Sequence, residues 1–578
     1  MAEKITIVFG GIQGEGVVST GDTLIKALSR SGYFAYGYRT FSSRIKGGHT
    51  NYAIEISTKR VLSCSEALDV LVAFDQDSID IHYNKLKEGG LLIYDDIILV
   101  KELQRTLTDK KITWLAAPLT KSAKAYGSTV MKNTAIIGLL GKLFQLPFSN
   151  VQGIIQQTFQ KKGEEIVAKN LSVLQESYDS PLIEALEVSR YALSPSETPS
   201  TRASMIGNEA LALGALAAGC RFMAAYPITP ASEIMEYLTK KFTQLNGVMV
   251  QTEDEISAVT MTIGASYAGV RSMTATSGPG ISLMMEGIGL AGMAEIPLVV
   301  VDAQRGGPST GLPTKHEQSD IDCLYHGPHG EIPAIILSPY SAEECFYQAM
   351  EAFNLAEKYQ CPVFLMSDLN LSLSRQTIDP LDVHRISIDR GKITEVPDHG
   401  PAGAQAYKRF RFTEDGISPR AYPGMPNHMH PLTGIEHQET GRPDESSKNR
   451  SQMMEKRMNK LNSLKVLPGV DVFGNPHSEL LVLSMGSNYG IIKDAVESFN
   501  IPVAFGMIKR IKPLPVNQLT QLFQQYPKIL VIENNYTGQL TNILKQEIGY
   551  HHQIHSLVRY DGLPFIHKDI RMKIEELI

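Results

Sequence analysis

Three consecutive acids, Glu253-Asp254-Glu255, follow a short apolar segment at Val248–Thr252 and precede a stretch of small and apolar residues. A carboxyl group at the end of a strand can transfer protons if its surroundings fix its position and its pKa. Burial would raise that pKa and favour a proton donor. The alternative is that the three acids cap a helix, whose N-terminus favours negative charge. Taken alone, the segment favours the capping interpretation, but the sequence around it, which includes Gly264 nine residues after Glu255, favours a site instead.

A second candidate site is the glycine-rich segment from Gln304 to Lys315. The planar guanidinium of Arg305 can hold a carboxylate through two hydrogen bonds, and Gly306 and Gly307 leave room for a ligand beside it. The alternative is an exposed loop arginine. The glycines and Pro308 favour an ordered ligand loop, which includes Lys315.

Thr229 stands between two prolines in Tyr226-Pro227-Ile228-Thr229-Pro230, at the end of another predicted strand. Ligands of open α/β sheets bind at the carboxyl ends of the strands. The prolines would fix the turn and present the threonine hydroxyl. Taken alone, the segment favours an ordinary helix start with a hydroxyl cap. The acids and the arginine that follow favour a site instead.

A second glycine-rich segment forms the turn after the first predicted strand and contains Gly11, Gly14 and Gly16. Such a turn lets backbone amides approach an anion at a helix N-terminus. The spacing departs from the dinucleotide pattern, because Ser19 occupies the last glycine position and no acid follows in the next predicted strand. We therefore favour a structural turn over a nucleotide site, and leave open whether the turn serves packing or an anionic ligand.

The elements that would position these residues alternate between apolar, β-branched runs and helical patterns, which is typical of the α/β class. The first sheet is expected to be parallel, with strands at Ile5–Phe9, Val70–Phe74 and Leu91–Tyr94. A doubly wound sheet should follow, and a helix after it should begin at the capping box Ser341-Ala-Glu-Glu344. We predict α/β domains at 1–190, 202–376 and 466–578, a linker at 191–201 and an irregular connection at 377–465.

Length and composition limit the function classes. The chain has 578 residues, which exceeds what one hydrophobic core usually supports. Its net charge of -6 gives no general attraction to nucleic acid or anionic membranes. No apolar run approaches the roughly 18 residues of a membrane span, and we expect a cytoplasmic protein. The five cysteines are widely spaced without a CxxC pair, so no metal or iron–sulfur ligand set is predicted.

The span from Tyr226 to Asp320, which also contains Thr274-Ala-Thr-Ser-Gly-Pro-Gly280, resembles the alpha subunit of 2-oxoacid:ferredoxin oxidoreductases. The first domain is similar to the gamma subunit of that family, fused ahead of alpha. The second resembles the pyrimidine-binding domain of thiamine-diphosphate enzymes, and the third resembles a transketolase-C-like domain. The resemblance thus extends over essentially the whole chain.

The resemblance implies a role for each candidate residue. Glu255 would hydrogen-bond the aminopyrimidine ring of thiamine diphosphate and favour the tautomer that takes the proton from the thiazolium carbon. Arg305 would pair with the substrate carboxylate, Thr229 would help to seat the 2-oxoacid, and Thr314 would line its side-chain pocket.

The resemblance also implies a partner. The sequence contains no Gly-Asp-Gly segment for the diphosphate and its Mg²⁺. In the family a beta subunit holds the diphosphate, the Mg²⁺ and a 4Fe–4S cluster, so a heterodimer or a dimer of heterodimers is expected, with coenzyme A as co-substrate and ferredoxin as acceptor. The fusion most resembles 2-oxoglutarate enzymes. The alternatives are pyruvate or branched-chain 2-oxoacids, and, in another class, a non-catalytic nucleotide- or CoA-binding interaction protein.

Overall fold

The computed structural model describes residues 2–42, 47–98, 104–195, 201–394 and 407–578. The chain folds into two compact units. Unit 1 contains Met1–Ile206 and Leu373–Leu381, and unit 2 contains Gly207–Ser372 and Asp382–Ile578. Within the described ranges, no helix combines the length and the apolar character needed to cross a membrane.

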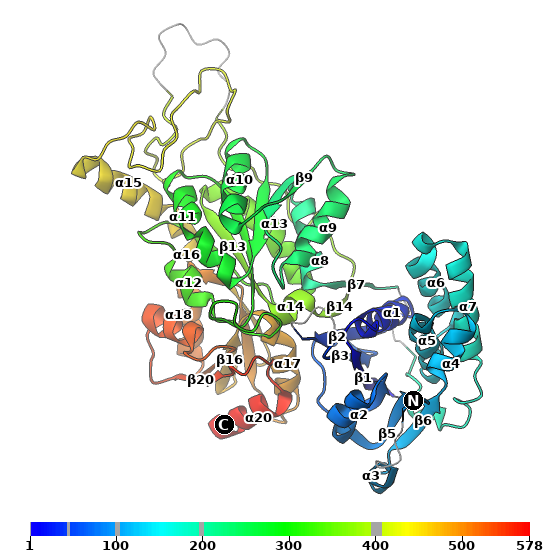
Figure 1. The fold of residues 1–578 in the computed structure, drawn as a ribbon. Helices are drawn as coiled ribbons and strands as arrows, with labels where there is room; N and C mark the ends of the chain where they lie inside the picture. Colours follow the sequence, from blue (N-terminus) through cyan, green and yellow to red (C-terminus); the bar gives the residue numbers. More distant parts are fainter. Residues whose placement is uncertain (1, 43–46, 99–103, 196–200, 395–406) are drawn as a thin grey trace. The chain divides into compact units, whose positions relative to one another are not determined.

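Unit 1 is built on one eight-stranded sheet in the order β6-β5-β4-β1-β3-β2-β14-β7 (Figure 1). Its strands are β1 (Lys4–Ile12), β2 (Phe34–Thr40), β3 (His49–Ser57), β4 (Leu68–Ala73), β5 (Leu86–Asp95), β6 (Thr113–Ala117), β7 (Ala203–Ile206) and β14 (Arg375–Ile378). Strands β1, β4, β5 and β6 run parallel to one another, whereas β3, β2, β14 and β7 continue the sheet through antiparallel pairs. The prediction of a parallel sheet is therefore wrong for the half of the sheet that contains β3, β2, β14 and β7, because a β2–β3 hairpin pairs directly with β1.

Helices cover both faces of this sheet. They are α1 (Val17–Arg30), α2 (Gln76–His82), α3 (Gln104–Asp109), α4 (Leu119–Ala125), α5 (Lys132–Leu143), α6 (Phe148–Phe159) and α7 (Glu164–Tyr178). The main core joins apolar residues of α1, α5, α6 and α7 to one face of the strands, and a smaller core lies under α2 on the other. Burial of these apolar surfaces stabilises the unit.

Unit 2 begins with a seven-stranded sheet in the order β18-β12-β13-β11-β10-β8-β9. The strands are β8 (Phe222–Ala225), β9 (Val248–Gln251), β10 (Ser272–Thr276), β11 (Leu298–Gln304), β12 (Ile335–Leu337), β13 (Pro362–Asp368) and the antiparallel edge strand β18 (Arg510–Lys512). The other strands are parallel, and the chain order reverses between β8 and β10. Such a reversal is where open α/β sheets place a ligand crevice.

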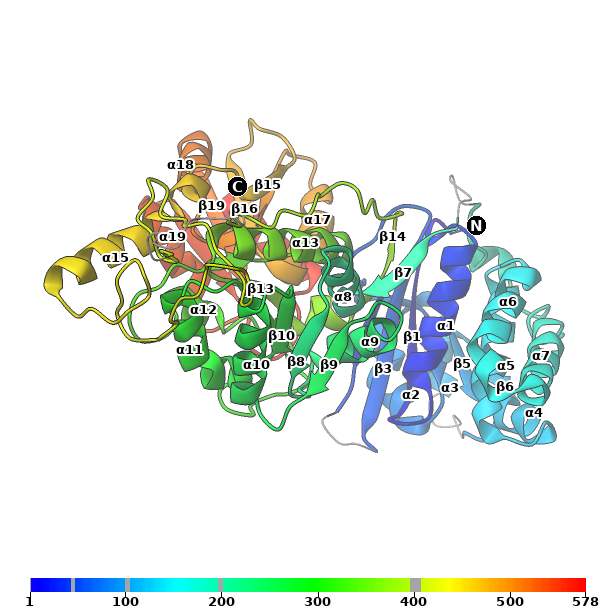
Figure 2. The ribbon, with the colours of Figure 1, turned by 90° about the horizontal axis from the view of Figure 1, so that it is seen from above.

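Seven helices accompany this sheet in the described residues: α8 (Gly207–Ala217), α9 (Ser232–Phe242), α10 (Glu255–Tyr267), α11 (Gly278–Met293), α12 (Ile321–His326), α13 (Ala342–Tyr359) and α14 (Leu369–Leu373). Helices α10 and α11 cover one face and α8 and α13 the other (Figure 2). The predicted cap of α13 is confirmed, since the Ser341 hydroxyl accepts a hydrogen bond from the Glu344 amide.

A five-stranded sheet closes the chain in the order β15-β17-β16-β19-β20. Its strands are β15 (Val470–Phe473), β16 (Leu480–Ser484), β17 (Ala504–Ile508), β19 (Lys528–Glu533) and β20 (Ile554–Val558), and its helices are α17 (Tyr489–Glu497), α18 (Val516–Gln525), α19 (Gln539–Ile548) and α20 (His567–Leu577). One hydrophobic core runs from the helices of the seven-stranded sheet into this part of unit 2. The α/β class predicted for all three parts is confirmed.

The connection between these two sheets is not wholly irregular. It contains α15 (Ser447–Asn459) and α16 (Asn462–Lys465), which the sequence did not reveal because α15 is mostly polar and lacks a broad apolar stripe. Buried ion pairs fix it to the sheet domain. Lys456 and Lys460 contact the two carboxylate oxygens of Glu295 at 2.7 and 2.6 Å, and Arg420 contacts Glu357 at 2.6 Å.

Candidate functional site

The candidate residues of unit 2 lie at the carboxyl ends of neighbouring parallel strands. Thr229 follows β8, Glu255 follows β9 and Arg305 follows β11. Strands β9, β8, β10 and β11 are consecutive in the sheet, so its topology places the three residues along one edge. Two of them are in direct contact: the Arg305 guanidinium donates a hydrogen bond of 2.7 Å from Nη1 to the backbone oxygen of Thr229.

Within the acidic tripeptide, Asp254 and Glu255 have different roles. Asp254 caps α10 by accepting a hydrogen bond of 2.6 Å from the Ser257 amide. Glu255 is the first residue of that helix and is only 5% exposed, whereas Glu253 is exposed. Burial raises the pKa of Glu255, and Asp254 adds to the rise while Arg305 opposes it. The capping alternative thus applies to Asp254, and Glu255 has the environment of a proton-holding carboxyl.

Gly280 lets the start of α11 approach Glu255. A Cβ at this position would lie 2.7 Å from Glu255 Cγ and 2.8 Å from Glu255 Oε1, and it would collide with the Thr276 hydroxyl. A larger residue would therefore displace the carboxylate. This gives a structural reason for the second glycine of Ser277-Gly278-Pro279-Gly280.

Arg305 is a buried cation, with 7% of its surface exposed. Burial lowers its pKa, while Asp320 and Glu255 act in the opposite direction. Among the described residues its Nε has no hydrogen-bond partner. A buried guanidinium that retains an unused donor can bind an incoming anion.

The loop after Arg305 is closed by its own backbone. The Gly306 amide donates to the Lys315 carbonyl at 3.1 Å, and the Leu312 amide donates to the Gly306 carbonyl at 2.8 Å. The Gly307 amide donates to Glu317 Oε2 at 3.0 Å. These bonds order the loop, and they occupy the two glycine amides that could otherwise have faced a ligand. Thr314 and Lys315 are half-buried side chains of the same loop.

The N-terminal glycine turn lies in unit 1. Gly11 ends up inside β1, where a Cβ would lie 2.9 Å from Val17 Cγ2. Gly16 has a φ of 89° and precedes α1, and a Cβ there would collide with the Asn133 side chain. Gly14 also has a positive φ, of 101°, but an added Cβ would meet nothing within 4 Å. The structure thus gives packing reasons for Gly11 and Gly16, and a purely conformational one for Gly14.

Two acids that the sequence patterns did not single out adjoin this site. Asp302 interrupts the apolar strand β11, and Asp320 precedes α12. An acid inside a fully buried strand was a signal available in the sequence, since unpaired carboxylates are rarely buried. The position of Asp320 beside it depends on how the loop folds back, which no local pattern shows.

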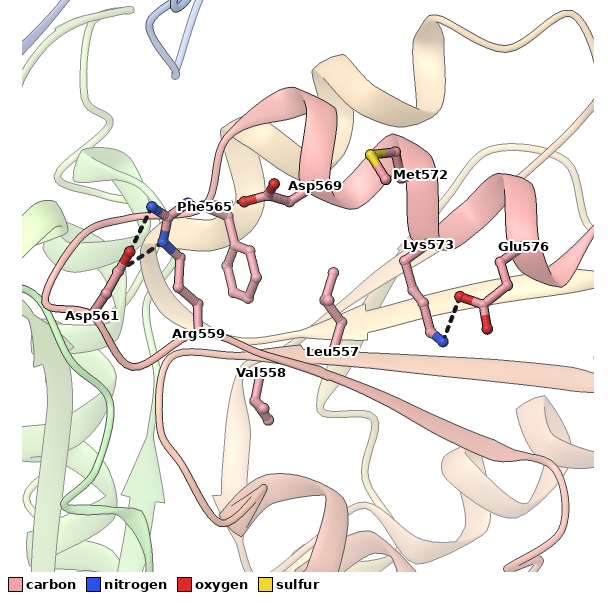
Figure 3. A pocket seen from close by; sticks show the side chains of 9 residues that line it. All are labelled: Leu557, Val558, Arg559, Asp561, Phe565, Asp569, Met572, Lys573 and Glu576. Atoms are coloured by element: carbon pink, nitrogen blue, oxygen red, sulfur yellow. Dashed lines mark hydrogen bonds and ion pairs between the residues drawn. The ribbon is translucent and has the colours of Figure 1, made fainter.

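A groove elsewhere in unit 2 contains none of the predicted site residues. It has a volume of about 470 Å³ between β20 and α20 (Figure 3). Its charged side chains are paired with one another: Arg559 with Asp561 and Asp569, and Lys573 with Glu576. Within the described ranges, the chain also has no group of three or more His, Cys, Asp or Glu side chains placed to hold a metal.

Comparison with known proteins identifies the family. The chain is 34% identical to a 2-oxoacid:ferredoxin oxidoreductase subunit alpha from Sulfolobus sp, over 100% of this chain and 97% of that protein. The chain belongs to this oxidoreductase family. It is also 31% identical to the 2-oxoglutarate oxidoreductase subunit KorA of Mycobacterium tuberculosis, over 98% of this chain and 90% of that protein.

Family models match two parts of this oxoacid:ferredoxin oxidoreductase subunit. Residues 213–456 match the thiamine-diphosphate-binding part of pyruvate flavodoxin/ferredoxin oxidoreductases. Residues 6–180 match a pyruvate ferredoxin/flavodoxin oxidoreductase model. The resemblance seen in the sequence is thereby confirmed, and the alternative of a non-catalytic binding protein is not supported.

A solved structure extends the likeness of this alpha subunit to the whole chain. It is the 2-oxoglutarate:ferredoxin oxidoreductase from Magnetococcus marinus with 2-oxoglutarate, coenzyme A and succinyl-CoA bound, which is 35% identical with a TM-score of 0.90 and covers 100% of both chains. The residues present in the thiamine-diphosphate-binding part also suit the pyrimidine end of that cofactor. The buried Glu255 has a raised pKa, and Gly280 keeps the space beside its carboxylate free of a Cβ.

Proposed function

We propose that this alpha subunit serves an enzyme that converts 2-oxoglutarate, coenzyme A and two oxidised ferredoxins into succinyl-CoA, carbon dioxide, two reduced ferredoxins and one proton. The observation that carries the substrate choice is the 35% identity over the full length of both chains with the Magnetococcus marinus enzyme, whose structure contains 2-oxoglutarate and succinyl-CoA. Pyruvate and branched-chain 2-oxoacids remain the competing substrates, since they share the carboxylate that Arg305 would bind.

Within that reaction the chain contributes the pyrimidine side of the active site. When bound, thiamine diphosphate supplies a nucleophilic carbon for the 2-oxo group and accepts the electron pair left by decarboxylation. Glu255 would hold the aminopyrimidine ring and keep a proton at its carboxyl oxygen, because burial raises its pKa. Its place at the start of α10, with Asp254 as the cap, fixes that oxygen relative to the sheet edge.

Arg305 would bind the carboxylate next to the reacting carbonyl. Its Nη1 is oriented by the Thr229 carbonyl, which leaves other N–H groups of the guanidinium for a substrate. Thr229 would in addition help to seat the 2-oxoacid, and Thr314 would line the pocket for its side chain. Lys315, in the same closed loop, or a basic residue of the partner chain would meet a distal carboxylate.

The remaining machinery belongs to a beta subunit in this proposal, in a heterodimer or a dimer of heterodimers. The sequence has no Gly-Asp-Gly segment, and its five cysteines include no CxxC pair, so the Mg²⁺, the diphosphate and the 4Fe–4S cluster that passes electrons to ferredoxin are assigned to the partner.

The helices beside Glu255 also present an uncovered apolar surface: Ile256 and Met261 on α10 are 50% and 41% exposed, and Leu283 on α11 is 50% exposed. Contact with a second chain would cover it.

The test is an anaerobic assay of the purified complex with a panel of 2-oxoacids, coenzyme A and a viologen dye. Arg305→Lys keeps the charge but loses the planar fork, so kcat/KM should fall for every 2-oxoacid by about 10- to 100-fold. Thr314→Val should instead change the ratio of kcat/KM between 2-oxoglutarate and pyruvate. A preference for pyruvate in the wild-type complex would overturn the substrate choice. An altered ratio in Arg305→Lys with an unchanged ratio in Thr314→Val would overturn the two residue roles.

A further inference from the structure

The loop that carries Thr314 and Lys315 continues into a segment that is held by the five-stranded sheet. The His316 amide donates a hydrogen bond of 3.1 Å to the carbonyl of Gly562, in the segment after β20. A Cβ on Gly562 would lie 3.0 Å from Lys315 Cβ, so the backbone of that segment packs closely against the loop. The loop begins at the end of β11 in the seven-stranded sheet, but its last residues are supported by another sheet.

Gln318 is the centre of this attachment, and it is fully buried. Its amide donates to the Asn534 carbonyl at 2.7 Å, and its carbonyl accepts from Asn535 Nδ2 at 3.0 Å. Its side chain adds two contacts, because Oε1 accepts from the Asn534 amide at 3.2 Å and Nε2 donates to Asp368 Oδ2 at 2.9 Å. Asn534 and Asn535 follow β19, whereas Asp368 is the last residue of β13. This glutamine therefore connects the carboxyl ends of strands from the two sheets.

The five-stranded sheet also shapes the space around the Gln318 side chain. Gly486 follows β16 with a φ of 60°, and a Cβ there would collide with Asp368 Oδ2 and lie 2.8 Å from Gln318 Nε2. The Ser487 amide donates to the same Asp368 oxygen at 2.9 Å. The carboxylate that receives the Gln318 side chain is thus itself held by backbone that follows β16. Buried hydrogen bonds that are connected in this way fix the geometry of the groups they join.

A second glutamine holds the residues that follow. Gln539 is the first residue of α19, and its Nε2 donates to the Ser319 carbonyl at 3.0 Å. Its Oε1 accepts from the amide of Asp322, in the first turn of α12, also at 3.0 Å. The attachment therefore extends from His316 to the start of α12.

The two ends of the ligand loop have different supports. Arg305 directly follows β11 and donates to the Thr229 carbonyl, so its position depends on the seven-stranded sheet. Thr314 and Lys315 lie four and three residues before Gln318, next to the attachment to the five-stranded sheet. Loss of the attachment should move these two residues and leave Arg305 in place.

We propose that Gln318 is a positioning residue for substrate selection, which attaches the ligand loop to the five-stranded sheet and so holds Thr314 and Lys315 toward the side chain of the 2-oxoacid. The proposal rests on the proposed function of these two residues. The five-stranded sheet contains none of the predicted site residues, yet it would take part in choosing between a 2-oxoacid that carries a distal carboxylate and one that does not.

The test uses glutamine-to-methionine variants of the assembled complex, because methionine has a similar length but lacks the amide. Gln318→Met should lower the ratio of kcat/KM for 2-oxoglutarate to that for pyruvate by about 10-fold, mainly through a higher KM for 2-oxoglutarate. Proton–deuterium exchange at the reactive carbon of thiamine diphosphate should keep its wild-type rate, since Glu255 is not displaced. Gln539→Met, at a half-buried position, should change the ratio in the same direction by a smaller factor.

Gln518→Met is the matched control. Gln518 Oε1 accepts from the amides of Gly469 and Val470 at 2.8 and 3.0 Å, so this side chain holds the start of β15 and not the ligand loop. The variant loses buried hydrogen bonds and should lower Tm, but its substrate ratio should equal that of the wild type. An equal change of the ratio in Gln518→Met would show a general effect of destabilisation and would overturn the proposal.

A second measurement does not depend on turnover. Amide hydrogen exchange of peptides from residues 306–322 in the assembled complex should be at least about 10-fold faster in Gln318→Met and unchanged in Gln518→Met. A wild-type substrate ratio in an assembled Gln318→Met complex would overturn the proposal, and if that variant does not assemble, a wild-type ratio in Gln539→Met would do so. If Thr314→Val leaves the ratio unchanged, the proposed role of Thr314 fails instead, and hydrogen exchange still judges the attachment by itself.

Discussion

Substitution of Gly280 by alanine adds one methyl group at the most confined point beside Glu255. The new carbon would lie 2.7 Å from Glu255 Cγ and 2.8 Å from Oε1, and it would collide with the Thr276 hydroxyl. Atoms cannot remain at such distances, so either the carboxylate or the start of α11 must move. Overpacking of this kind costs about 1–3 kcal/mol, against a gain of up to about 1 kcal/mol from replacing a helical glycine.

Gly289→Ala is the matched control in the same helix. A Cβ there would lie 3.7 Å from Pro328, which is ordinary van der Waals contact. This variant should be neutral or more stable by up to about 1 kcal/mol. The two variants should therefore differ in stability by about 1–3 kcal/mol, and the Tm of the isolated chain gives the sign of that difference.

The functional effect should exceed the effect on stability. A displacement of about 1 Å in a proton-transfer group can cost on the order of 100-fold in rate. We expect Gly280→Ala to slow proton–deuterium exchange at the reactive carbon of thiamine diphosphate by about 10- to 100-fold in the assembled complex, with little change in the KM for the 2-oxoacid. Gly289→Ala should exchange at the wild-type rate. Normal exchange in a folded Gly280→Ala complex would refute the inference that this glycine positions Glu255.

Three further predictions concern pH and packing. Burial raises the pKa of Glu255, so ionisation of this carboxyl destabilises the folded state as the pH rises above its pKa in the unfolded chain. Glu255→Gln should therefore raise Tm more at pH 8 than at pH 5, while exchange at the reactive carbon of the cofactor falls by about 100-fold. An equal change in Tm at both pH values would contradict the raised pKa. Burial alone would raise the pKa of Glu295, but Lys460, Lys456 and Arg409 hold it well below its usual range, so the network stabilises the fold at neutral pH and less in acid. Glu295→Gln leaves two buried lysines without their carboxylate partner and should lower the free energy of unfolding, measured by calorimetry at neutral pH, by about 3–5 kcal/mol. A decrease below about 1 kcal/mol would mean that the remaining charges rearrange. Gly16→Ala, which meets Asn133, should lower Tm more than Gly14→Ala, although both glycines have positive φ; equal losses would show that backbone strain alone matters there.

Local patterns in the sequence were sufficient for some of the regular elements of this fold. The strand predicted at Ile5–Phe9 lies within β1, and the capping box at Ser341 starts α13. Both predictions depend on residues that are close to each other in the sequence. Thr229 and the three acids at 253–255 could be placed at strand ends for the same reason, because each directly follows a strand-like segment.

Features that depend on distant parts of the chain could not be found in this way. The division of tasks between Asp254 and Glu255 depends on which side chain turns inward, and three adjacent acids look alike in sequence. Asp320 reaches Gly278 only through the fold of the loop after β11. The local sequence of β2 and β3 does not show that β3 pairs antiparallel with β1.

The two outer strands of the unit 1 sheet, β14 and β7, come from residues beyond the predicted linker at 191–201. Scission within 191–201 would therefore not release a self-sufficient N-terminal fragment. A fragment of residues 1–190 would expose β2 as an unprotected edge, and such edges recruit other strands. Conversely, a fragment that begins after the linker carries the two strands that complete the sheet. If the chain were divided there, each fragment would present the strand edge that pairs with the other in the intact sheet.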